Sequence, residues 1–302
     1  MATAKFGRVI TAMITPFKEN GDVDYEGAVA LAKYLISHGS EGLLVGGTTG
    51  EGATMSAEEK LRLYQAIVDA VGSRSAGKKV PIMGNVGTIS TKESIDFLRK
   101  AEKTGIDSVL AIVPFYVKPT QEGMYQHFKA IADSTKLPVI VYNVPGRVGV
   151  SIQPETIKRL TDVCPNIVGV KDATGNWDQV TKERALLPED FMLYSGDDSF
   201  TLPILAAGGV GVISVASHVI GDDILSMVDA FEKGNLAAAQ KLHIKMYPIM
   251  KGVFFIASPI PIKTAVNLIG QPGGKFRLPM VDPNPSEKEH VRKMLEDYGG
   301  LL

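Results

Sequence analysis

Lys171 is the residue whose type and position most favour chemistry in this sequence. It ends an apolar run, Ile167–Lys171, that has the composition of a strand buried on both faces. Burial disfavours the ammonium form and lowers the pKa of a lysine, so the amine at this place becomes neutral. A neutral amine can add to a carbonyl group and form an imine. The alternative is a lysine that extends its ammonium group into solvent from the strand end.

Polar side chains follow two other apolar runs. Tyr142 lies at the end of Val139–Asn143, and its phenol could pass protons to and from a molecule on Lys171, although by itself it is more typical of a core tyrosine with a satisfied hydroxyl. Thr48 and Thr49 belong to the segment GGTTGEG, whose glycines would let backbone N–H groups approach an anion. The segment lacks the phosphate-loop pattern, so it suits a carboxylate better than a nucleotide.

Two further loops carry candidate side chains. Arg147 follows the letters NVPG and can pair with a carboxylate through two parallel hydrogen bonds, although a surface salt bridge is also open. Tyr116 lies in the proline-rich segment PFYVKP, where a tyrosine by itself indicates packing or a subunit contact.

Metal, nucleic acid and membrane have little support in the sequence. The pair Asp197–Asp198 fits a turn or a helix cap better than a cation site. The formal net charge of −1 provides no basic surface for nucleic acid, and no apolar run reaches the ~18 residues of a membrane span. No metal-ligand spacing relates the five histidines, which are His38, His127, His218, His243 and His290.

The cellular compartment is predicted from the cysteine count and the first residues. Cys164 is the single cysteine, so an internal disulfide is impossible and a reducing compartment is favoured. The segment MATAKFGRVITAMITPF reaches polar and proline residues too early for the apolar core of a signal peptide. We therefore expect a cytoplasmic protein.

The scaffold that must position these residues is predicted from eight short apolar runs that alternate with stretches of helical period. Continuous Val/Ile/Leu runs indicate parallel strands covered by helices, and eight units favour a closed (β/α)8 barrel over the runner-up, a doubly wound sheet. The Gly208–Gly211 cluster precedes a strand instead of opening a helix, unlike a dinucleotide fingerprint. The runs are Val9–Ile14, Gly42–Val45, Val80–Met83, Ser108–Val113, Val139–Asn143, Ile167–Lys171, Phe191–Ser195 and Gly211–Val215.

The barrel accounts for residues 1–235. The remainder, residues 236–302, has the pattern of helices, and no flexible linker precedes it. We expect this C-terminal helical region to pack on the barrel.

The segments at the predicted strand ends resemble a known family. GGTTGE, PFY, YNVPGR, GVKDATG, SGDD and GVISV occur in the order and spacing of the dihydrodipicolinate synthase / N-acetylneuraminate lyase family, and PIPIKTA resembles its C-terminal region. Six such motifs in order are a specific signal, and they extend over nearly the whole chain. Thr48-Thr49 and Arg147 resemble the synthases more than the sialic acid lyases, which typically carry Ser-Thr at the first place.

The resemblance implies a reaction and a role for each residue. Lys171 would form an imine with pyruvate, and the derived enamine would attack L-aspartate-4-semialdehyde. Tyr142, Thr48 and Tyr116 would form a proton relay, with Tyr116 contributed by a neighbouring subunit. Thr49 would hold the carboxylate of pyruvate with backbone N–H groups of its loop.

The resemblance also implies the remaining contacts and the assembly. Arg147 would bind the carboxylate of the second substrate, and Gly196 and Ile213 would line the pyruvate pocket. No metal or organic cofactor is required, and the family is commonly a homotetramer built from tight dimers.

Two alternative functions remain open. The first is an N-acetylneuraminate or 2-keto-3-deoxy sugar acid lyase of the same family, which would keep Lys171 and Tyr142 but act on a sugar acid. Arg147 and Thr48 argue against it. The second is a non-catalytic barrel that senses a keto acid, against which stands the complete set of relay residues, since a sensor does not need a proton relay.

Inhibition by lysine is predicted to be weak or absent. Many relatives bind lysine at the dimer interface through polar residues, where this chain has Ala57, Lys60, Ile89 and Phe115. Ala57, Ile89 and Phe115 lack the polar side chains of that site, although Glu93 matches. An activity assay titrated with lysine tests this expectation, and inhibition at micromolar lysine would contradict it.

Overall fold

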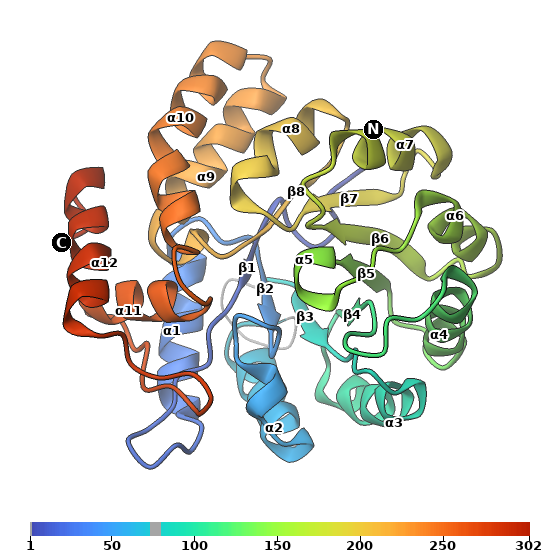
Figure 1. The fold of residues 1–302 in the computed structure, drawn as a ribbon, viewed down its shortest axis with the longest axis horizontal. Coiled ribbons are helices and arrows are strands. Elements are labelled where there is room, and N and C mark those ends of the chain that lie inside the picture. Colours follow the sequence, from blue (N-terminus) through green and yellow to red (C-terminus); the bar gives the residue numbers. More distant parts are fainter. Residues whose placement is uncertain (1, 73–79) are drawn as a thin grey trace.

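Eight parallel strands form a closed barrel, in which each strand is hydrogen-bonded to the next and β8 closes on β1. The computed structural model of the protein describes residues 2–72 and 80–302. Figure 1 shows the strands at the centre of the molecule and the helices around them. The strands are β1 (Val9–Ala12), β2 (Gly42–Val45), β3 (Ile82–Asn85), β4 (Ser108–Ile112), β5 (Val139–Asn143), β6 (Ile167–Asp172), β7 (Met192–Ser195) and β8 (Gly211–Ser214). The predicted (β/α)8 barrel is confirmed.

The strands are buried on both faces, as their continuous apolar sequences predict. Every residue of β4 and of β5 is buried. One face of each strand fills the barrel interior and the other packs on helices, so no alternation of polar residues is possible. The register places Tyr142 of β5 beside Lys171 of β6, and Lys171 beside Tyr194 of β7. The two predicted reactive side chains therefore lie at the same level of the barrel.

Two of the helices that cover the barrel, α1 and α2, begin at side chains that cap their first turns. The side chain of Asp24 accepts a hydrogen bond from the N–H of Gly27, and Ser56 and Glu59 form a reciprocal capping box. None of the described helices is long and apolar enough to span a membrane. The helices between the strands are α1 (Tyr25–Ser37), α2 (Ala57–Val71), α3 (Thr91–Ala101), α4 (Gln121–Asp133), α6 (Pro154–Val163), α7 (Trp177–Leu186), α8 (Thr201–Ala206) and α9 (Ser217–Glu232).

Local details differ from the sequence-based expectation in three places. The third strand begins two residues late, because Pro81 has no N–H to donate and contributes only its carbonyl to Leu43. The helical pattern after the eighth run predicts a helix from about Asp222, but α9 begins at Ser217 and has a non-helical residue at Ile220, where two short helices join. A short helix, α5 (Pro145–Val148), follows β5 and was not predicted, because four residues carry no helical periodicity.

Three helices follow the barrel: α10 (Leu236–Gly252), α11 (Ile260–Leu268) and α12 (Pro285–Tyr298). They lie together on one side of the barrel, where α10 packs on α9 and α12 packs on α10 and α11 (Figure 1).

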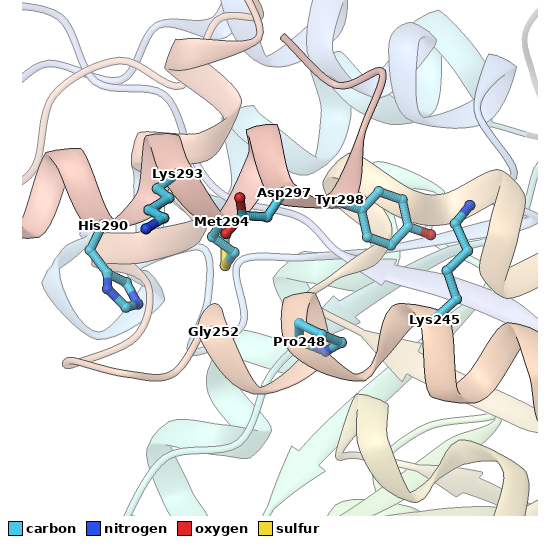
Figure 2. Close-up of a pocket in the computed structure, with 8 residues that line it drawn as sticks. All are labelled: Lys245, Pro248, Gly252, His290, Lys293, Met294, Asp297 and Tyr298. Atoms are coloured by element: carbon cyan, nitrogen blue, oxygen red, sulfur yellow. The ribbon is translucent and has the colours of Figure 1, made fainter.

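A surface cavity of about 460 Å³ lies between α10 and α12 (Figure 2). It shares no lining residue with the cavity at the strand ends. Its lysine Lys245 is already paired with Asp223, at 2.7 Å between Nζ and Oδ2, and its other charged side chains are exposed. The larger of the two cavities therefore does not contain the predicted chemistry.

Candidate active site

A cavity of about 250 Å³ opens at the carboxyl ends of the strands. Side chains from the ends of β1, β3, β5 and β6 reach it, namely those of Ala12, Asn85, Tyr142 and Lys171. The carboxyl ends of barrel strands converge with their loops, so residues distant in sequence meet there. Six of the eight predicted site residues line this cavity: Thr48, Thr49, Tyr142, Arg147, Lys171 and Gly196.

Lys171 is buried at the floor of this arrangement. Its side chain belongs to β6, and the residue is 5% exposed. Burial lowers the pKa of Lys171 to about 7, the negative charge of Asp198 opposes this effect, and the positive charge of Arg147 adds to it. A pKa near 7 leaves about half of the amine neutral at neutral pH, so Lys171 can act as a nucleophile there.

Tyr142 lies next to that amine. The Nζ atom of Lys171 is 4.3 Å from the centroid of the Tyr142 ring. Burial raises the pKa of Tyr142 to about 12, and the charge of Arg147 opposes this rise. The phenol is therefore protonated at neutral pH, so it can donate a proton to a molecule attached to Lys171 and take it back.

The glycine-rich segment after β2 forms the loop that carries Thr48 and Thr49. Gly46 has a φ of +68°, and a side chain on Gly52 would lie 2.0 Å from the carbonyl oxygen of Gly46. The loop can therefore fold this tightly only with glycine at both positions. Thr49 is buried while Thr48 is exposed, and both reach the cavity.

Arg147 is brought to the cavity by α5. Pro145 begins this helix, since its fixed φ suits the first helical position. Gly149 has a left-handed conformation and ends the helix after a single turn. The side chain is exposed, and among the described residues Arg147 has no ion pair. Its guanidinium group is available to a carboxylate in the cavity.

Two predicted site residues lie outside the lining of the cavity. Tyr116 follows β4 in an exposed loop, is 87% exposed and has a φ of +66°, which is unusual for a bulky residue. Ile213 lies in β8 and is 1% exposed, and Val215, two residues further along, lines the cavity in its place. The described chain alone therefore does not bring Tyr116 to Lys171.

Asp198 is a buried acidic residue near the site. From the sequence, the pair Asp197–Asp198 was predicted to form a turn or a helix cap. Asp197 does cap a turn, accepting from the N–H of Ser199 at 2.9 Å. Asp198 itself is 2% exposed and accepts hydrogen bonds from the N–H groups of Val215 and Ala216, at 3.1 and 3.0 Å. It thereby holds the chain after β8 and places a negative charge near Lys171. Among the described residues, no group of three or more His, Cys, Asp or Glu side chains could hold a metal ion.

The C-terminal region also contributes to the cavity. Lys251 and Phe254, near the end of α10, and Ser258, before α11, line it beside the barrel residues. Sequence reasoning missed them because the strand-end rule applies to the barrel only. The apolar composition around Phe254 and Phe255 was the available signal, since two adjacent large apolar residues outside a strand require a partner surface.

Fold and cavity together define a (β/α)8 barrel enzyme with a desolvated lysine at its strand ends. The family model that matches residues 5–298 describes the dihydrodipicolinate synthetase family. The chain belongs to this family.

Individual relatives agree with that assignment. The chain is 47% identical over 295 residues to the 4-hydroxy-tetrahydrodipicolinate synthase of Desulforudis audaxviator, with 98% of each chain covered. The dihydrodipicolinate synthase of Cyanidioschyzon merolae, solved with lysine bound, matches with a TM-score of 0.94 and 43% identity over 98% of this chain and 99% of that one. The enzyme of Thermotoga maritima matches with a TM-score of 0.93 and 39% identity over 98% and 99%.

The nucleophilicity of Lys171 leads to a test that needs no substrate. Acetic anhydride acylates only neutral amines and does not itself ionise between pH 5 and 11, so its initial rate of reaction at each lysine follows the deprotonation of that lysine. We expect modification of Lys171 to be half-maximal near pH 7, because burial lowers its pKa from 10.5 to about 7. Peptide mass mapping across pH 5–11 measures this. Modification of Lys171 that rises only near pH 10 would contradict the assignment.

Proposed function

We propose that the protein is a 4-hydroxy-tetrahydrodipicolinate synthase, which condenses pyruvate with L-aspartate-4-semialdehyde in lysine and diaminopimelate biosynthesis. The observation that carries the proposal is Lys171, a buried amine with a pKa near 7 that lies against Tyr142 in the strand-end cavity. Relatives that match this chain over nearly their whole length bear this name.

The reaction begins with addition of the neutral Lys171 amine to the C2 carbonyl of pyruvate. The carbonyl oxygen takes protons and leaves as water, so a C=N bond replaces the C=O bond. Loss of a methyl proton then converts the imine to an enamine. The enamine carbon attacks the aldehyde carbon of the second substrate, whose oxygen is protonated to a hydroxyl group. Finally the substrate amino group attacks the imine carbon, closes the ring and releases Lys171.

Each of these steps moves a proton, and Tyr142 is placed to move it. Its phenol stays protonated at neutral pH because burial raises its pKa to about 12. We assign Thr48 and Tyr116 to the same relay. The exposed Thr48 lies at the cavity, where its hydroxyl group can connect Tyr142 to solvent or to a further donor.

The two substrates each carry a carboxylate. The site offers two places for these groups, the backbone N–H groups of one loop and the guanidinium group of Arg147. The loop of Thr49 presents backbone N–H groups to the carboxylate of pyruvate. Arg147, unpaired among the described residues, receives the carboxylate of the second substrate. Gly196 borders the pyruvate pocket, because a side chain there would lie 3.1 Å from Cγ of Lys171, and Ile213 supports it from β8.

A test of the proposal is borohydride trapping with pyruvate, followed by peptide mass mapping. The expected adduct lies on Lys171, and Lys171→Arg, whose guanidinium group is not nucleophilic, should give none. Tyr142→Phe should lower kcat by about a hundredfold or more, the usual contribution of a proton-transfer group. A coupled assay with aspartate semialdehyde or a sugar acid then identifies the second substrate. An adduct on another lysine would overturn the assignment.

The assembly is a further part of the proposal. Phe115, Tyr116 and Val117 are exposed next to one another, and Tyr116 lies outside the cavity of its own chain. We propose that this loop enters the cavity of a second copy, in a homotetramer built from dimers. Residues 1–235 form the barrel and residues 236–302 a region packed on it, and the assembled protein acts in the cytoplasm.

The oligomer is tested by sedimentation velocity at micromolar protein. We expect a tetramer, and Tyr116→Phe should lower kcat without changing the assembly, because it removes only the hydroxyl group. Charged residues at the loop, as in Val117→Glu, should dissociate the dimer and lower activity together with it. A fully active monomer would contradict the proposed role of Tyr116.

A further inference from the structure

A second buried lysine lies on helix α11, next to the glycine-rich loop after β2 that carries Thr48 and Thr49. This loop is called the substrate loop. Lys263 is 0% exposed, and its Nζ donates to Oε1 of Glu51 at 2.7 Å and to the carbonyl oxygen of Thr15 at 2.9 Å. Its partner Glu51 is 5% exposed. The ion pair thus connects a residue near the C-terminus to the segment that follows Thr48 and Thr49.

Glu51 has a backbone conformation that its side chain contacts maintain. Its φ of +51° lies in the left-handed region, which glutamate rarely adopts. Its N–H donates to the carbonyl oxygen of Thr48 at 3.1 Å, and the N–H of Gly52 donates to Gly47 at 3.0 Å. The conformation of Glu51 therefore closes the loop on which Thr48 and Thr49 lie.

Two more contacts hold the same loop. The hydroxyl group of Thr15 donates to the carbonyl oxygen of Gly50 at 2.7 Å, so Thr15 connects Lys263 to the loop through its own backbone. The N–H of Arg277 donates to Oε2 of Glu51 at 3.2 Å, and its guanidinium group donates to the carbonyl oxygen of Thr54 at 3.1 Å. The loop is thus held by residues that do not line the cavity.

We propose that Lys263 and Glu51 are positioning residues, which hold the backbone of Thr48 and Thr49 in the conformation that binds the carboxylate of pyruvate. This inference rests on the proposed function, since it requires that the loop bind pyruvate. Neither Glu51 nor Lys263 lines the cavity. Their effect on the substrate passes through the loop, in which small displacements weaken several N–H contacts together.

The test compares Glu51→Gln, Lys263→Met and the double variant with the parent protein. Glu51→Gln leaves the Lys263 ammonium group buried without its carboxylate, which lowers the melting temperature. We expect Glu51→Gln to raise the KM for pyruvate about tenfold. Its kcat should stay within about threefold of the parent value, and its KM for the second substrate should be unchanged. In the double variant, stability should recover, because no unpaired charge remains, while the KM for pyruvate stays high because the loop is still not held.

A matched control separates positioning from stability. Glu41 pairs with Arg8 at the opposite, amino end of the strands, where Oε2 accepts from Nε at 3.0 Å. Glu41→Gln should lower the melting temperature while the KM for pyruvate stays within about twofold of the parent. An equal rise in KM for both variants, or no rise for folded Glu51→Gln, would overturn the inference.

Thr15→Val is the gentler variant, to be used should Glu51→Gln not fold. It keeps the shape of the side chain and the carbonyl that binds Lys263, and it removes only the hydrogen bond to Gly50. The KM for pyruvate should rise about threefold, and an unchanged KM would contradict the inference. Borohydride trapping of the parent protein distinguishes a failure of the proposed function from a failure of the positioning role alone. With no adduct on Lys171 the proposed function fails, whereas with an adduct and unchanged KM values only the positioning role fails.

Discussion

Desolvation of the Lys171 amine is the interaction on which the site depends. A pKa of about 7 in place of 10.5 corresponds to a preference for the neutral form on the order of 5 kcal/mol. Such a preference requires that most of the water around Nζ be removed, and the closed barrel removes it, because β5 and β7 border β6 on both sides. An open sheet edge at β6 would hydrate the amine and return it to the ammonium form.

Two charged residues adjust this desolvation in opposite directions. Asp198 stabilises the ammonium form of Lys171, and Arg147 destabilises it. The burial effect exceeds both, so the pKa remains close to neutral pH. The carboxylate of Asp198 accepts hydrogen bonds from backbone N–H groups after β8. These bonds fix its position and stabilise its negative charge. The carboxylate of Asp198 therefore lies near the nucleophilic amine with hydrogen-bond partners of its own.

The barrel and the pair of Lys171 and Tyr142 could be predicted from the sequence, because they follow from local patterns. Continuous apolar runs fix the strands, and a lysine or tyrosine at the end of such a run must lie at the strand-end face. Lys251 and Asp198 could not be placed, because their positions depend on how α10 packs and on which N–H groups a carboxylate meets after folding. The short α5 was missed for a similar reason, since four residues have no period. Tyr116 was predicted as a site residue only through the family resemblance.

The C-terminal helices are part of the site and not only a cover for the barrel. Lys251 and Phe254 complete the wall of the cavity, and Lys263 lies beneath the loop that carries Thr48 and Thr49. A barrel needs no extra helices to close its sheet, so their packing has to be explained by what they touch. They touch the cavity on one side and the substrate loop on the other. A glycine-rich loop offers N–H groups to an anion only because it is pliable, and a pliable loop needs external contacts to keep one conformation. The buried ion pair between α11 and Glu51 provides such a contact from a part of the chain more than two hundred residues away.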